Sequence, residues 1–181
     1  MPFITYPQPN GQVAVIIPCE GATKFVKVIE EVPILDEEGN PTGETNMVTR
    51  EESVPMTIED IAAKDVPEGL PYKIVESLDL DNDFFNAYDF HPDNGVAENI
   101  SRAQTIQLNT WRDLRAPLLS KLDVYFSMAL ERSDTTSQAT IASQKQALRD
   151  VTKTELPSDT IANIKAVIPS ILTQQYTYPI T

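Results

Sequence analysis

The sequence predicts an α+β protein, with an N-terminal β-rich, sandwich-like module followed by a C-terminal α-helical module. Residues 1–95 contain 5 Lys or Arg and 19 Asp or Glu, whereas residues 96–181 contain 9 and 8, so the first part supplies the net charge of −13. All six glycines lie at or before Gly95. Apolar residues alternate in the first part and recur every three or four positions in the second, which is typical of strands and helices respectively.

The boundary between the modules is expected at His91–Gly95, because the sequence His-Pro-Asp-Asn-Gly is typical of a turn. We therefore expect an acidic β-rich module at residues 1–95 and an α-helical module at residues 96–181.

Short β-branched and alternating stretches predict the strands of the first module. These strands are residues 12–17, 23–35, 44–54 and 72–75. Residues 57–64 predict one short helix, since Thr57 can cap its first turn and Glu59 and Asp60 follow there. Four aromatic residues between Phe84 and Phe90 are expected to fill the small β core.

The strands at residues 23–35 and 44–54 predict a long, exposed hairpin, because the eight residues between them are polar and include two glycines and a proline. Two interpretations of the acidic turn are open: it stays solvated and discourages edge-to-edge strand pairing, or the hairpin protrudes and contacts a partner. If it contacts a partner, the candidate client-binding residues are the apolar ones near the tip: Val32, Ile34, Leu35, Met47 and Val48.

A long helix is predicted from Ile100, with an apolar seam that repeats every 3.5 residues or so. The seam consists of Trp111, Leu114, Leu118, Leu122 and Tyr125. Pro117 lies within it and should kink the helix or begin a new one. Either packing inside the module or self-association could bury this seam. Two further helices are expected, one ending near Val151 and one stopped by Pro169.

Composition argues against several classes of partner. The strongly acidic balance, with a pI of about 4.4, repels phosphate backbones and anionic membranes, so neither a nucleic acid nor a membrane is expected as a partner. The longest apolar stretch, from Val13 to Ile17, is too short to span a bilayer. The single cysteine, Cys19, excludes an internal disulfide framework.

No catalytic, cofactor-binding or metal-binding residues are expected. His91 is the sole histidine and lies in the predicted turn, with no marked nucleophile beside it. Asp79, Asp81 and Asp83 alternate as at the start of a calcium loop. The sixth position of that loop needs glycine but holds Phe84, which rejects an EF-hand.

Three stretches carry a family resemblance. They are residues 61–75 (IAAKDVPEGLPYKIV), 112–123 (RDLRAPLLSKLD) and 145–152 (KQALRDVT). Together they are similar to the small phage proteins that are encoded beside tail fibres and called tail fibre assembly chaperones. With further matches at Phe84, Phe85, Ala87 and Tyr88, at residues 129–131 and in the short helix that ends at Pro169, the resemblance extends over about two-fifths of the chain, and the N-terminal 55 residues lie outside it.

The resemblance implies a non-enzymatic, ATP-independent chaperone that acts in the host cytoplasm during phage assembly. Its N-terminal part would grip the distal receptor-binding region of a tail fibre protein, and its helical part would form a homo-trimer matched to a trimeric fibre. No cofactor is implied. A structural virion protein of the tail or baseplate is the alternative, and an enzyme that uses His91 on a surface glycan is a third.

Overall fold

The computed structural model describes residues 2–178, which divide into two compact units. Unit 1 contains the residues up to Leu78 together with Phe90–Gly95, and unit 2 contains Asp79–Asp89 and the residues from Val96 onward. Strands lie in the N-terminal half and most helices in the C-terminal half, which confirms the α+β class. Residues 79–89, which were expected in the β-rich module, instead belong to the helical unit.

Unit 1 is built on a three-stranded antiparallel sheet. Its strands are β1 (Phe3–Pro7), β2 (Val13–Ile16) and β5 (Lys73–Val75), in the order β2-β1-β5. Ile4 of the central strand β1 pairs with Ile16 on one side and Ile74 on the other. The predicted sandwich is wrong, because within residues 2–178 no second sheet packs face to face on this one.

Helix α1 (Ile58–Asp65) completes the core of unit 1. The Asp60 amide donates to the Thr57 hydroxyl, and the Thr57 amide donates to the Asp60 carboxylate, which forms the capping box that starts the helix. Ile61 and Ala62 face inward and pack with Ile4. The short helix predicted at residues 57–64 is therefore confirmed.

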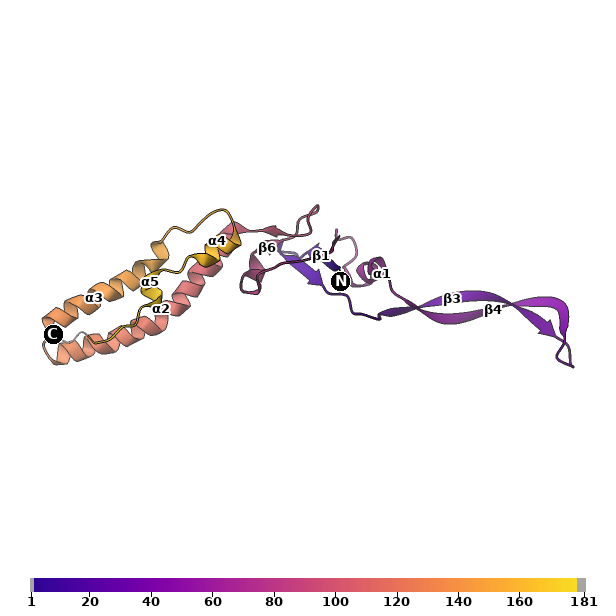
Figure 1. Ribbon diagram of the computed structural model, residues 1–181, viewed down its shortest axis with the longest axis horizontal. Helices are drawn as coiled ribbons and strands as arrows, with labels where there is room; N and C mark the ends of the chain where they lie inside the picture. Colours follow the sequence, from indigo (N-terminus) through magenta and orange to yellow (C-terminus); the bar gives the residue numbers. More distant parts are fainter. Residues whose placement is uncertain (1, 179–181) are drawn as a thin grey trace. The chain divides into compact units, whose positions relative to one another are not determined.

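Strands β3 (Thr23–Leu35) and β4 (Pro41–Pro55) form a separate two-stranded antiparallel ribbon, which Figure 1 shows as long and twisted. Its register runs from Thr23 opposite Pro55 to Pro33 opposite Thr45, and an irregularity follows Pro33. An ion pair between Lys24 and Asp60 joins the base of the ribbon to α1. The hairpin expected from the sequence is present.

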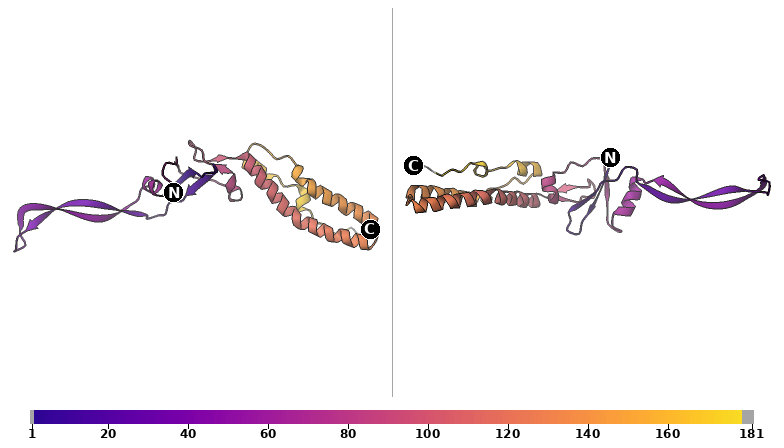
Figure 2. Two further views of the ribbon diagram at one scale, coloured as in Figure 1. Left: turned by 180° about the vertical axis from the view of Figure 1, so that it is seen from behind. Right: turned by 90° about the horizontal axis from the view of Figure 1, so that it is seen from below.

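Unit 2 centres on two antiparallel helices, α2 (Ile100–Glu131) and α3 (Thr135–Asp150). Figure 2 shows the C-terminal segment lying along one face of this pair. That segment carries α4 (Ile161–Ala166) and α5 (Ser170–Thr173). The smaller elements are η1 (Asn82–Ala87), β6 (Tyr88–Asp89), β7 (Ala97–Glu98) and η2 (Val151–Lys153).

Pro117 does not interrupt α2, contrary to one of the two expectations for it. The core of unit 2 gathers buried side chains of both long helices, of η2 and of the C-terminal segment. They are Trp111, Leu122, Ala129, Ile141, Leu148, Val151, Leu172 and Tyr176. Tyr176 is buried in this core, and the Tyr178 ring meets the Tyr125 ring edge-on, so the C-terminal segment is held on the helix pair.

Two expectations about apolar residues fail. Phe84 was placed in the β core, but it is buried in unit 2 within η1. The helix that was expected to run up to Pro169 is shorter, since α4 ends at Ala166, and Ile168 beyond it is 57% exposed. Among residues 2–178, no helix combines the length and the apolar composition that crossing a membrane requires.

Candidate protein-binding ribbon

The first feature of the ribbon is an exposed row of large apolar side chains on one face. Side chains alternate between the two faces of a strand, so Phe25 and Ile29 lie on the same face of β3. Ile29 pairs with Thr49, which places Met47 of β4 diagonally beside it. Phe25, Ile29 and Met47 are 75%, 62% and 65% exposed. We call these three residues the apolar stripe.

The opposite face of the ribbon carries valines and ion pairs. Val32 and Val48 lie there, both exposed, and Arg50 contacts Glu30 at 2.7 Å and Glu52 at 3.9 Å. Ion pairs this exposed contribute at most ~1 kcal/mol, so they do little to hold the two strands together.

The structure leaves all five sequence-predicted client-binding residues exposed but does not bring them together. Val32 and Val48 share one face, whereas Met47 points to the other. Ile34 and Leu35 lie beyond, next to the turn, where the register shifts. Phe25 and Ile29 were not among the predicted residues, although the alternation in residues 23–35 places both on one face of the strand. Their proximity to Met47 follows only from the cross-strand register.

The turn at the tip is ordered by its own hydrogen bonds. The Asp36 carboxylate accepts from the amides of Glu38 and Asn40, both at 2.9 Å. The hydrogen bond from the Asn40 amide is the main reason that the pKa of Asp36 is lowered. Gly39 adopts a φ of 86°, which favours glycine. Residues 33–46 include four carboxylates and no basic residue, so the tip is a defined negative surface.

This arrangement is suited to binding another protein rather than to standing alone. A two-stranded hairpin is at best marginally stable in water. In the described residues, neither β3 nor β4 pairs with a third strand, and no other element covers the apolar stripe. Exposed apolar side chains beside unpaired strand edges favour contact with a second chain, either over the face or along an edge.

The predicted helical seam lies largely inside unit 2. Trp111 and Leu122 are fully buried, and Leu118 and Tyr125 are partly buried against the same core. Leu114 is the exception, at 46% exposed. Packing within the unit therefore buries most of the seam, which was one of the two solutions expected for it.

His91 and the alternating aspartates take part in local structure. The His91 Nδ1 accepts from the amides of Asp93 and Asn94, at 3.3 and 3.4 Å, and so helps to close its turn. Asp81 and Asp83 each contact the Lys165 ammonium at 2.8 Å. These hydrogen bonds lower the pKa of Asp81 and raise the pKa of Lys165. Across the described part of the chain, no group of three potential ligands could hold a metal ion.

No family model, curated protein or solved structure matches the chain.

Proposed function

We propose that the protein is a non-enzymatic assembly chaperone that binds the distal region of a phage tail fibre stoichiometrically in the host cytoplasm. The observation that carries the proposal is the apolar stripe on an uncovered β-ribbon. The family resemblance of residues 61–75, 112–123 and 145–152 supplies the identity of the client.

The ribbon offers the chemistry that such a client requires. Fibre tips are intertwined β structures, and their strand edges can pair wrongly before assembly is complete. Covering an exposed Phe, Ile or Met side chain contributes about 1.5–3 kcal/mol before the entropic cost of association. The three side chains of the apolar stripe would together contribute about 4.5–9 kcal/mol toward that cost, with no use of ATP.

The helical unit would set the copy number in this proposal. Leu114 is exposed and Leu118 and Tyr125 are only partly buried, so part of the seam remains accessible to other copies of the chain. Three copies held in register would match a trimeric fibre.

Co-expression with the fibre protein encoded beside this chain tests the proposal. We expect a soluble complex whose mass by light scattering gives a fixed stoichiometry, and an aggregated fibre when the chain is omitted. The double variant Phe25→Ser/Ile29→Ser should lose the complex, because it removes two of the three stripe side chains. Thr49→Ser, which lies opposite Ile29 on the same face, is the matched control and should retain it.

Circular dichroism of the variants shows whether the ribbon still folds. If the double variant folds and still binds the fibre as the wild type does, the ribbon is not the binding element. A fibre that folds alone and never co-elutes would refute the chaperone function. The alternative, a structural protein of the tail or baseplate, predicts stoichiometric amounts of the chain in purified virions by mass spectrometry.

A further inference from the structure

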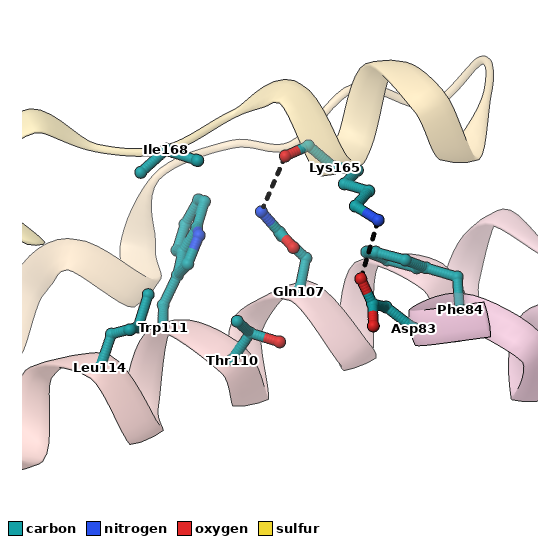
Figure 3. Close-up of a pocket in the computed structure, with 8 residues that line it drawn as sticks. All are labelled: Asp83, Phe84, Gln107, Thr110, Trp111, Leu114, Lys165 and Ile168. Atoms are coloured by element: carbon teal, nitrogen blue, oxygen red, sulfur yellow. Dashed lines mark hydrogen bonds and ion pairs between the residues drawn. The ribbon is translucent and has the colours of Figure 1, made fainter. Parts of the chain in front are cut away.

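A pocket of about 470 Å³ lies within unit 2, and Leu114 of the helical seam is among its lining residues. Figure 3 shows it between α2, the segment around α4, and η1. Its lining residues are Asp83, Phe84, Gln107, Thr110, Trp111, Leu114, Lys165 and Ile168. The volume falls in the range of about 300–1,000 Å³ that is typical of ligand pockets.

One wall of the pocket presents a buried donor without an acceptor. Trp111 is fully buried, and its indole N–H has no hydrogen-bond partner within the described residues. Figure 3 shows the indole nitrogen on the ring edge that faces Gln107. The Gln107 amide group donates to the carbonyls of Val167 and Lys165, at 2.8 and 3.4 Å. Because a buried donor without an acceptor is unfavourable, the indole N–H favours a ligand that brings an acceptor.

The rim of the pocket beside the indole is apolar and exposed. Leu114 is 46% exposed, and Ile168, which is 57% exposed, lies next to the indole in Figure 3. Ile168 belongs to the short connection between α4 and α5 rather than to a helix. Its side chain can therefore change rotamer at the rim of the pocket without moving a helix.

The other end of the pocket is acidic. The Lys165 ammonium is shared by Asp81 and Asp83, which leaves one surplus negative charge. The Asp83 side chain is 76% exposed, so its carboxylate can meet a further cation in solution. The pocket thus combines an apolar end, a neutral donor and an acidic end.

We propose that this pocket binds an extended peptide segment of a partner protein. One aliphatic side chain of the segment lies between Leu114 and Ile168, a main-chain carbonyl accepts from the Trp111 N–H, and a Lys or Arg two residues away meets Asp83. Side chains two residues apart in an extended chain point to the same side and lie ~7 Å apart.

The single tryptophan makes the test direct, because the ¹⁵N-labelled full-length chain has one indole N–H signal in its NMR spectrum. The probes are the blocked peptides acetyl-Arg-Gly-Leu-Ala-amide and acetyl-Ala-Leu-Gly-Arg-amide, which present the two chain directions. We expect at least one of them to move the indole signal saturably at low-millimolar concentration. The same peptide with Ser in place of Leu should not move it.

Variants of the protein then identify each contact. Leu114→Asp should abolish the shift, whereas Val124→Asp, at a more exposed apolar position of α2 outside the pocket, should preserve it. Asp83→Asn should weaken binding of the Arg peptide by up to about fivefold, the range for an exposed ion pair.

The proposal is overturned if neither peptide moves the indole signal. It is also overturned if the Ser peptide moves the signal as the Leu peptide does, or if the signal of the Leu114→Asp protein moves as that of the wild type does. A saturable shift with decanoate but with neither peptide would also overturn it, since the pocket would then bind a small amphiphile.

Discussion

Replacing Gly95 with alanine adds a single methyl group and thereby tests the packing of unit 1. The φ of Gly95 is 80°, a conformation that costs an L-residue about 1–2 kcal/mol. A Cβ at this position would lie 2.7 Å from the Thr5 hydroxyl and 2.8 Å from a methyl group of Val75. Thr5 is fully buried in the central strand β1, so it has little room to move away.

The expected loss for Gly95→Ala is therefore the sum of two effects. Backbone strain contributes about 1–2 kcal/mol, and forcing a methyl group into a packed site contributes a further 1–3 kcal/mol or so. Gly69→Ala is the matched control, because Gly69 has a φ of 82° but no atom within 4 Å of the added Cβ. It should show the strain alone.

Thermal denaturation followed by circular dichroism measures the difference between the two variants. In a domain of roughly 60–100 residues, such as unit 1, a difference of 1 kcal/mol shifts the melting midpoint by roughly 4–8 °C. Gly95→Ala should therefore melt at least ~4 °C below Gly69→Ala. Equal midpoints would refute the reasoning, since they would mean that the residue 90–95 segment does not lie against β1 and β5.

Two further predictions concern unit 2. Leu122→Ala should lower the free energy of unfolding by about 2–5 kcal/mol, because Leu122 is fully buried. Val124→Ala should lower it by less than ~1 kcal/mol, because Val124 is 59% exposed. Urea denaturation followed by Trp111 fluorescence measures both, and similar losses would contradict the assignment of Leu122 to the buried face of α2. The pKa of Asp81 is lowered mainly by its hydrogen bond with Lys165, so the folded state favours the ionised carboxylate. The stability that Asp81 contributes is therefore present above the unfolded pKa of about 3.8 and is lost as the pH falls below that value. Asp81→Asn should therefore weaken the dependence of the melting temperature on pH in that acidic range, and an unchanged acid profile would exclude the Lys165 contact as its source.

The sequence determined the elements whose causes are local. The strand at residues 23–35 coincides with β3 because alternation and the flanking turn residues act within the strand itself. Helix α1 begins after Thr57 because the capping box is complete within four residues. The α+β class follows in the same way from the change of periodicity between the two halves.

The candidate site could be predicted only in part. The sequence indicated an exposed hairpin, and the five residues chosen near its tip are exposed. Which apolar side chains share a face depends on the cross-strand register, which pairs Ile29 with Thr49 and sets Met47 beside it. That register made Phe25 and Ile29, rather than the residues nearest the tip, the core of the candidate surface.

Only the tertiary structure decided the assignments that depend on residues far apart in the sequence. Residues 3–7 carry no strong strand pattern, yet they form the central strand because β5, about seventy residues later, pairs with them. Phe84 follows an acidic stretch of the β-rich half but is buried in unit 2. Trp111 of the predicted seam lines a pocket together with Lys165, which lies far along the chain. Local patterns fix the type of an element, whereas its partners are selected by long-range burial, which no single segment of the sequence encodes.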